Sequence, residues 1–296
     1  FMNVLSDRII NLTESATLRM AALARELQQK GVNVINLSLG EPDFQTPQHI
    51  KDAAKKAIDD GYTFYTPVSG YLDLRQAICA KFKRENGLDY TPEQIVVSTG
   101  AKQSIINVVL CMVNPGDEVI LPAPYWVSYA AMVELAEGKV VELPTGIEKN
   151  FKMTAQQLEA AITPKSKLII FSSPSNPTGM VYTKDELHDI AKVIAAHPNL
   201  YIVSDEIYEH INYSGKHESI AQFDFVKDRV ITVNGLSKGF AMTGWRLGYI
   251  GAPVAIAKAC DKMQGQFTSG TCSITQRAAI AALNESLAPT IEMREA

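Results

Sequence analysis

The sequence predicts an α/β domain: a mainly parallel seven-stranded sheet sandwiched by helices. Two observations indicate this fold. Seven short apolar runs rich in β-branched residues recur along the chain, and segments with apolar residues at helical spacing lie between most of them. Strands that alternate with helices are typical of parallel sheets, and an uninterrupted apolar run such as 168–171 belongs in the middle of a sheet buried on both faces.

The expected elements follow in chain order. The N-terminal part predicts helices over 13–29, 47–60 and 72–86, a short strand over 34–39, and an aromatic loop at 61–70. The strands of the sheet are expected at 95–98, 118–121, 139–143, 167–171, 200–204, 229–233 and 247–250. Further helices are expected at 102–112, 155–162, 184–196 and 273–283, and another begins at 289.

These elements divide the chain into three expected parts. Residues 1–45 form an N-terminal arm and helix, residues 46–284 a large domain, and residues 285–296 the start of a C-terminal domain that the chain does not complete. The last expected helix has neither a C-capping glycine nor a following strand, so the sequence predicts that the chain stops inside an architecture.

Composition excludes several classes of protein. The 296 residues are 46% hydrophobic and 20% charged, which excludes a disordered or fibrous chain. The net charge of −4 leaves no excess of positive charge for a nucleic acid. No apolar run approaches the ~20 residues that span a bilayer, and none resembles a signal peptide. The four cysteines have no metal-binding spacing, so we expect reduced thiols, a cytoplasmic location and no metal site.

Ligands of open α/β sheets bind beyond the carboxyl ends of the strands, so the residues after each run are candidate site residues. Lys238 follows the run at 229–233 and lies between Ser237 and Gly239. It is a candidate Schiff-base lysine, because burial beside other cations lowers the pKa of an ammonium and frees the amine that attacks a carbonyl. The alternative is a surface loop lysine.

Two further polar residues follow neighbouring runs. Asp205 comes directly after the run at 200–204 and can hold a proton on a heterocyclic nitrogen; a helix N-cap is the alternative. Asn176 lies in the turn 172–179, where two X-Pro bonds, either of which can be cis, fix the backbone. That turn would hold Asn176 as a donor toward the cleft, and an ordinary proline-rich turn is the alternative.

Two more signals follow strand ends. The residues 99–103 open a helix with small side chains, which expose backbone N–H groups that suit a phosphate. The spacings of a P-loop and of a dinucleotide-binding glycine motif are absent, which counts against ATP and NAD. Trp126 can stack on a flat ring, with a core role as its alternative. All five signals fall where one ligand could contact them together.

Taken together, these motifs resemble the class I aminotransferases of the fold-type I pyridoxal-phosphate enzymes, most closely the bacterial aspartate aminotransferase subgroup. The motifs that carry the resemblance span nearly the whole chain in the family's order: residues 39–44, 65–67, 99–103, 124–126, 176–179, 204–208, 237–238 and 244–246. The resemblance implies the large domain of the fold-type I transferases and pyridoxal 5'-phosphate as cofactor.

The resemblance also implies a role for each residue. Lys238 would form the Schiff base with the cofactor and move the α-proton of the substrate. Asp205 would keep the pyridine nitrogen protonated. Tyr208 and Asn176 would bind the phenolic oxygen, and Trp126 would stack on the ring. The residues implied for the phosphate are Gly100, Ala101, Lys102, Ser237 and Arg246.

Substrate and subunit contacts are implied in the same way. Gly40 would contact the substrate through its backbone, and Trp126 and Asn176 would line its site. Thr17 and Lys102 would contact a distal carboxylate; the alternative is that Thr17 caps a helix and Lys102 is solvated. Tyr65 would reach the phosphate of a neighbouring subunit, which implies a homodimer with shared sites. The family's arginine for the substrate α-carboxylate lies in a C-terminal domain, and we find no residue before Ala296 that matches it.

The implied activity is transfer of an amino group between an amino acid, aspartate, and a 2-oxo acid, 2-oxoglutarate. Two alternatives stay open. One is another reaction on the same cofactor, by an aromatic or prephenate aminotransferase or a carbon–sulfur lyase, since fold and cofactor site do not decide between these. The other is a non-catalytic regulatory module that binds the cofactor, against which the acidic charge balance argues.

Overall fold

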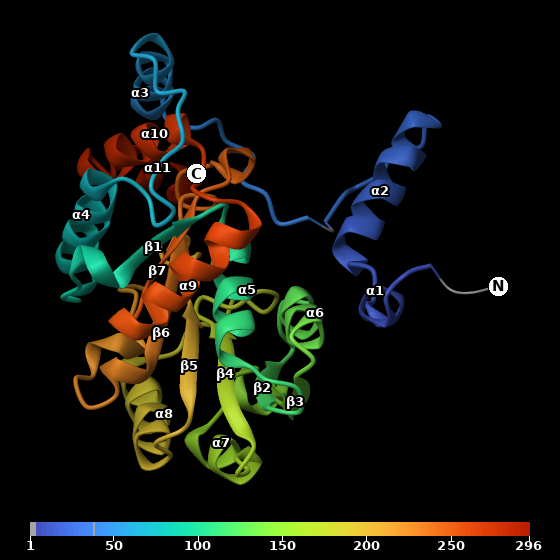
Figure 1. The fold of residues 1–296 in the computed structure, drawn as a ribbon. Helices are drawn as coiled ribbons and strands as arrows, with labels where there is room; N and C mark the ends of the chain where they lie inside the picture. The colour runs from blue at the N-terminus through green and yellow to red at the C-terminus, as the bar shows by residue number, and fades with distance from the viewer. Residues whose placement is uncertain (1–3, 38) are drawn as a thin grey trace.

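The computed structural model describes residues 4–37 and 39–296. In this part of the chain the strands form one seven-stranded sheet, in the order β1-β7-β6-β5-β4-β2-β3 (Figure 1). Neighbours run parallel except where β7 pairs antiparallel with β1 and β6. The mainly parallel sheet predicted from the sequence is confirmed. The strands are β1 (Ile95–Ser98), β2 (Glu118–Ala123), β3 (Lys139–Pro144), β4 (Ser166–Ser172), β5 (Tyr201–Asp205), β6 (Val230–Gly235) and β7 (Gly248–Gly251).

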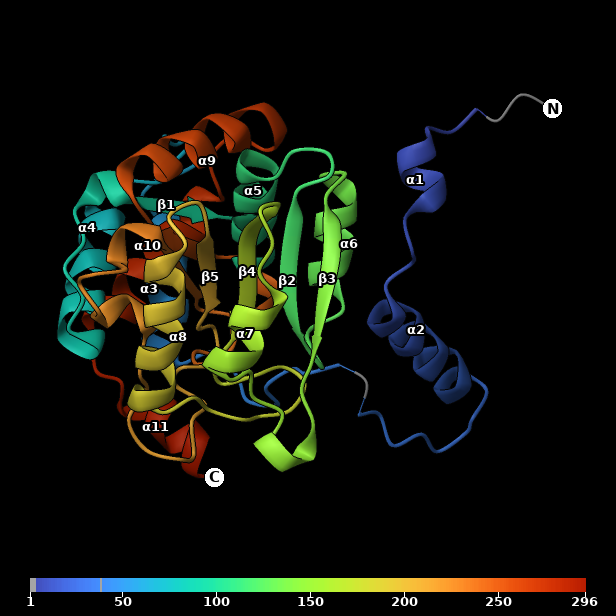
Figure 2. The same ribbon diagram turned by 90° about the horizontal axis from the view of Figure 1, so that it is seen from below.

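Helices cover both faces of this sheet (Figure 2). Buried side chains of α3, α4, α7, α8 and α10 form one apolar cluster, and those of α5, α6 and α9 form a second cluster. The α-helices are α1 (Asp7–Asn11), α2 (Ala16–Gln29), α3 (Gln48–Asp59), α4 (Leu72–Lys81), α5 (Ala101–Met112), α6 (Ser128–Leu135), α7 (Ala155–Ala161), α8 (Lys184–Ala196), α9 (Val254–Phe267), α10 (Ser273–Asn284) and α11 (Ala288–Glu295).

Strand β4 shows why the central runs are apolar without interruption. Successive side chains of a strand point to opposite faces. Ile169 and Phe171 accordingly belong to the first cluster, whereas Leu168 and Ile170 belong to the second. Since helices bury both faces, every position from Leu168 to Phe171 takes an apolar residue.

Strand β7 brings a further loop to the edge where the parallel strands end. It follows β6 through a hairpin whose connection covers 236–247, with Gly235 opposite Gly248. The amide of Leu236 donates a hydrogen bond to the carbonyl of Leu247 (3.2 Å) at the base of that connection. Because β7 runs antiparallel to β6, the residues just before it lie at the same edge as those that follow β4, β5 and β6.

The N-terminal helices α1 and α2 lie apart from the sheet domain (Figures 1 and 2). An exposed ion pair joins Arg8 of α1 to Glu137, which follows α6 in the sheet domain (3.3 Å). The helix predicted over 13–29 forms from Ala16, where the Ser15 hydroxyl accepts a hydrogen bond from the Leu18 amide (3.5 Å). No helix in the described part of the chain is long and apolar enough to cross a membrane.

The strand predicted over 34–39 is wrong. Residues 34–37 and Leu39 adopt no strand, and Ser38 lies outside the described residues. Ile35 and Leu37 are 84% and 91% exposed, so no neighbouring strand covers the apolar side chains of this segment.

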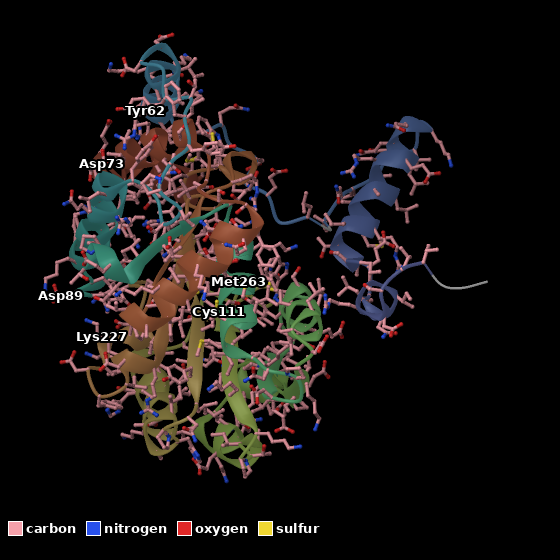
Figure 3. The ribbon with its side chains drawn as sticks, viewed as in Figure 1. Tyr62, Asp73, Asp89, Cys111, Lys227 and Met263 are labelled. Atoms are coloured by element: carbon pink, nitrogen blue, oxygen red, sulfur yellow. The ribbon has the colours of Figure 1, made fainter. Side chains whose placement is uncertain are left out.

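Helix α10 is joined to α4 through Arg277. Its guanidinium donates to both carboxylate oxygens of Asp73 (2.6 and 2.7 Å) and lies 4.9 Å from the ring of Tyr62 and 4.2 Å from that of Tyr71. Asp73 and Tyr62 are labelled in Figure 3. Arg277 is therefore part of the packing between helices, which agrees with the absence of a substrate-binding motif around it.

A buried ion pair fastens the turn after β5 to helix α4. The ammonium of Lys81, whose side chain is 1% exposed, binds the carboxylate of Glu209 and the amide oxygen of Asn86 (2.9 Å). Burial alone would raise the pKa of Glu209, but the positive charge of Lys81 holds that pKa well below its usual range. The pair thereby anchors the segment that contains Tyr208.

We expect Lys81→Met to lower the free energy of unfolding by about 3–5 kcal/mol, because it leaves the Glu209 carboxylate buried without its cation. Urea unfolding at neutral pH measures this change. The control is Lys83→Met, which breaks an ion pair with Asp89 whose side chains are 62% and 72% exposed, and which should leave the stability nearly unchanged. Similar losses for the two variants would contradict the prediction.

Candidate active site

The residues that follow β4, β5 and β6 meet at one edge of the sheet. Lys238 donates a hydrogen bond from Nζ to the carbonyl oxygen of Gly40, and Nζ lies 5.5 Å from the ring centroid of Tyr208. Together these three residues line a cavity of about 270 Å³. Segments 198 residues apart in the sequence therefore meet at this lysine.

Lys238 is half-buried in this cavity. Burial lowers the pKa of its ammonium and the Arg246 guanidinium adds to that effect, while the carboxylates of Glu41 and Asp205 oppose it. A lowered pKa increases the share of neutral amine, the form that attacks a carbonyl carbon. This environment favours the Schiff-base interpretation of Lys238 over the surface-loop alternative.

Asp205 is the last residue of β5 and is 4% exposed. Its Oδ2 accepts a hydrogen bond from the Tyr129 hydroxyl (2.6 Å), and its Oδ1 accepts one from the amide of Ile207 (3.3 Å). Burial raises the pKa of Asp205 to about 6 despite these two donors. Residues 207–210 form a turn rather than a helix, so Asp205 is no helix N-cap.

The raised pKa of Asp205 predicts a pH-dependent effect of Asp205→Asn on the protein alone. The folded state holds the carboxyl proton more tightly than the unfolded state, so the resulting stabilisation is present below pH ~4 and is lost as the pH rises through about 6. Above that pH, the wild-type protein carries a buried charge that asparagine lacks. We expect the variant to be more stable by roughly 3 kcal/mol at pH 7.5 and unchanged at pH 4.

Urea unfolding of the ligand-free protein at the two pH values measures this difference. Asp73→Asn is the matched comparison, because the Arg277 guanidinium holds the pKa of Asp73 below its usual value despite partial burial. The expected stability change for Asp73→Asn has the opposite sign. The wild-type ion pair stabilises the fold at pH 7.5, and that contribution is lost as the pH falls. A variant at position 205 that is less stable than wild type at pH 7.5 would contradict the prediction.

Asn176 and Tyr208 lie together, as the sequence predicts. The Asn176 side chain hydrogen-bonds the Tyr208 hydroxyl, while burial raises the pKa of Tyr208 to about 12. The peptide bonds 173–174 and 176–177 are both cis, as the sequence allows. A Cβ built on Gly40 would lie 3.7 Å from the Tyr208 hydroxyl, so the backbone of Gly40 passes close to the phenol.

The guanidinium of Arg246 lies against the first residue before helix α5. Gly100 has a φ of +85°, and a Cβ there would collide with that guanidinium. Gly248, the first residue of β7, approaches so closely that its Cβ would collide with the Ala101 amide. The Arg246 guanidinium therefore lies beside the free N–H groups at the start of α5. Ser237, which is buried, follows the neighbouring strand β6. This is a donor set that suits a phosphate dianion.

Trp126 is partly exposed rather than fully buried, which argues against a purely core role. The Nζ of Lys102 lies 4.9 Å from the Trp126 ring centroid. Burial lowers the pKa of Lys102, and the charge of Arg246 lowers it further. The side chain of Lys102 thus lies between the tryptophan and the candidate phosphate site.

Two predicted site residues are not brought to Lys238. Thr17 lies on α2, which stands apart from the sheet domain (Figure 1). Tyr65 is 97% exposed in the loop at 61–70. The substrate role of Thr17 and the intersubunit role of Tyr65 stay predictions.

The sequence analysis missed Tyr129, which binds Asp205 directly. It lies three residues after Trp126, and the two rings form a T-shaped contact with their centroids 5.4 Å apart. Trp126 precedes α6, whose N-cap is Val127, so helical spacing does not link the two residues and nothing in the sequence marked Tyr129.

Two groups of side chains in the described residues have the spacing of metal ligands: Glu85, Glu209 and His210, and Glu206, Glu209 and His217. The Lys81 ammonium already binds Glu209 inside this cluster. The carboxylate charge is therefore balanced by a protein cation, and we assign no metal to it.

The residues present fit pyridoxal 5'-phosphate. Lys238 would supply the amine, buried Asp205 a partner for the ring nitrogen, Asn176 and Tyr208 donors for the phenolic oxygen, and Arg246 with the start of α5 the phosphate site. This set, on a seven-stranded mainly parallel sheet, defines a pyridoxal-phosphate-binding domain of fold-type I. Residues 32–296 match the family described as "Aminotransferase class I and II". The chain belongs to this family, whose cofactor is pyridoxal phosphate.

Curated relatives agree with this assignment. The bifunctional aspartate aminotransferase and glutamate/aspartate-prephenate aminotransferase of Petunia hybrida is 54% identical over 280 residues, which are 94% of this chain and 58% of that protein. The aspartate/prephenate aminotransferase of Cereibacter sphaeroides is 50% identical over 292 residues, 96% of this chain and 71% of that protein. The chain thus spans just over half of one relative and about two thirds of the other.

Solved structures show the same architecture. The aspartate aminotransferase of Rhizobium meliloti matches with a TM-score of 0.96 and 42% identity over 99% of this chain and 74% of that chain. The aspartate aminotransferase of Thermus thermophilus, solved with maleate, matches with a TM-score of 0.95 and 43% identity over 99% of this chain and 76% of that chain.

Proposed function

We propose that the protein transfers an amino group between aspartate and a 2-oxo acid, 2-oxoglutarate, with pyridoxal phosphate held at the carboxyl edge of the sheet. One observation carries this proposal: Lys238, with its lowered pKa, contacts Gly40 and Tyr208 beside the buried carboxylate of Asp205. Relatives that share 50–54% of their residues with this chain are named aspartate or aspartate/prephenate aminotransferases, which favours amino transfer over a lyase or a regulatory module and keeps prephenate as an alternative substrate.

Binding and orientation of the cofactor would fall to residues from several segments at this edge of the sheet. Arg246 and the start of α5 would hold the phosphate, and Trp126 would stack on the ring. Asn176 and Tyr208 would donate to the phenolic oxygen, and Asp205 would hold the proton at the pyridine nitrogen. When bound, the cofactor supplies an electron sink for the α-carbon of the substrate.

Proton movement falls to Lys238. Its Nζ would hold the cofactor covalently in the resting enzyme, and as a free amine it would accept the α-proton of the substrate. The lowered pKa of Lys238 suits this second role, because a neutral amine can take a proton near neutral pH. The hydrogen bond to the Gly40 carbonyl holds Nζ in the cavity that the substrate would enter.

Borohydride reduction followed by peptide mapping tests this proposal. After addition of pyridoxal phosphate, reduction should fix the label on Lys238. A label on Lys102 or on exposed Lys262 instead would overturn the assignment. Absorbance changes with a panel of amino acids then distinguish the substrates. Aspartate should react readily, whereas a faster reaction with aromatic amino acids would favour an aromatic aminotransferase.

The same proposal includes a homodimer in the cytoplasm. Phe64 and Tyr65 are 83% and 97% exposed, and covering such aromatic surface in a second copy is favourable. All four cysteines are unpaired, which suits a reducing compartment. Mixing Tyr65→Ala and Lys238→Ala variants tests the shared site: a mixed dimer should regain activity that neither variant has alone, and no recovery would contradict it.

Lys102 should contribute to selection of a dicarboxylic substrate, together with Thr17. We expect Lys102→Ala to lower kcat/KM for aspartate by roughly 10–100-fold, the range for a hydrogen bond between charged groups. For alanine, which lacks a distal carboxylate, the loss should be under about threefold. Steady-state kinetics with both substrates measure the ratio, and equal losses would remove the specificity role.

A further inference from the structure

Tyr129 is a buried phenol beside the site that no role described so far uses. It lies on α6, is 1% exposed, and its hydroxyl donates to Oδ2 of Asp205 at 2.6 Å. Its ring forms a T-shaped contact with the Trp126 ring, and the two centroids lie 5.4 Å apart. Tyr129 thus contacts both the carboxylate meant for the ring nitrogen and the tryptophan meant for the ring face.

Tyr129 is also the middle of a chain of hydrogen bonds. The Ser172 side chain hydrogen-bonds Tyr129, and the Ser172 hydroxyl oxygen accepts from the backbone amide of Asn176 (3.1 Å). The Ser172 hydroxyl can then accept from the Asn176 N–H and donate to the Tyr129 hydroxyl. The Tyr129 hydroxyl in turn donates to Asp205. Such chains polarise each member toward the anion at their end.

We propose that Tyr129 is a positioning residue that fixes the Asp205 carboxylate and keeps it ionised, with Ser172 relaying the hydrogen bond from the Asn176 turn. This inference rests on the proposed function, since it concerns how Asp205 holds a proton on the cofactor nitrogen.

The groups around Asp205 explain why such a donor is needed. Burial and the neighbouring carboxylate of Glu206 raise the pKa of Asp205, whereas Tyr129, the Ile207 amide and the charge of Lys238 lower it. Tyr208 is the other ionisable group near Tyr129. Burial and the charge of Asp205 raise the pKa of Tyr129 well above its usual value, so its hydroxyl stays a donor across the working range.

Tyr129→Phe removes the hydroxyl and keeps the ring. Without that donor the carboxylate becomes more basic, and the proton it shares with the pyridine nitrogen moves toward Asp205. With ¹⁵N-labelled pyridoxal phosphate bound, the nitrogen signal should shift toward that of the unprotonated ring. The protonation equilibrium should change by roughly 10–100-fold, the range for a hydrogen bond to a charged group.

The control is Tyr90→Phe, which removes a phenol hydroxyl bonded to Thr232 (3.0 Å) and packed with the other apolar cluster. Its ¹⁵N signal should match wild type. Ser172→Ala should shift the signal in the same direction as Tyr129→Phe but less, and it decides the question if Tyr129→Phe does not fold. A wild-type signal in Tyr129→Phe, or in a folded Ser172→Ala if the first is lost, would overturn the inference.

Failure of the proposed function gives a different result. If the wild-type protein holds no pyridoxal phosphate on Lys238 after borohydride reduction, the proposed function and this inference fall together. If Lys238 is labelled in wild type and in Tyr129→Phe, and the nitrogen signals of both are the same, only the role of Tyr129 is removed.

Discussion

Lys238→Ala is expected to lower the rate of amino transfer by on the order of 10⁴-fold or more, because it removes both the covalent attachment and the group that moves the α-proton. Pyridoxal phosphate should still bind, since Arg246 and the start of α5 remain, but borohydride should no longer fix it to the chain. Single-turnover absorbance with aspartate measures the rate, and mass spectrometry measures the attachment.

Lys262→Ala is the matched control for this variant. Lys262 is exposed on α9, and its loss should change neither attachment nor rate. An added primary amine should restore part of the activity of Lys238→Ala, because it can act as the missing base. Retention of covalent cofactor by Lys238→Ala would contradict the assignment of this lysine.

Asp205→Ala is expected to slow proton removal from the substrate by roughly 10³-fold or more, equivalent to about 4 kcal/mol in the barrier. The buried carboxylate would keep the ring nitrogen protonated, which lets the ring take up electrons as the α-proton leaves, so its loss should act mainly on the transition state. Affinity for pyridoxal phosphate should fall much less, because the phosphate contacts persist.

Two measurements separate these effects for Asp205→Ala. Equilibrium titration gives the cofactor affinity, and the kinetic isotope effect with α-deuterated aspartate shows whether proton removal limits the rate. A rate within tenfold of wild type would show that Asp205 serves the fold alone. Asp205→Glu, which keeps the charge, should recover part of the rate.

The sheet could be predicted because its strands are buried on both faces. An uninterrupted run such as Leu168–Phe171 has one structural meaning once helical segments surround it, and the observed strands differ from the expected ones by one or two residues at their ends. Helix α6 was not predicted from the sequence, because its residues are apolar on nearly all sides and show no periodic pattern. Helix α9 was not predicted either, because small and polar residues alternate irregularly along it and hide the helical period of its apolar residues.

The candidate site was predictable because residues after parallel strands share one edge. Lys238, Asp205 and Asn176 could therefore be placed together from their positions alone. Tyr129 could not, since a tyrosine within a helix gives no sign that its hydroxyl reaches a neighbouring strand. The prediction of a strand at 34–39 failed for a related reason: a short apolar segment does not say whether a partner strand lies beside it.

The hairpin between β6 and β7 carries both Lys238 and Arg246 on a single connection, residues 236–247. These two side chains would bind two neighbouring groups of one small molecule, its carbonyl carbon and its phosphate, so the length of that connection sets the distance between the amine and the guanidinium. Surface loops ordinarily accept insertions without harm. This loop should not: one added residue would move the amine or the guanidinium out of reach, even in a protein that folds normally.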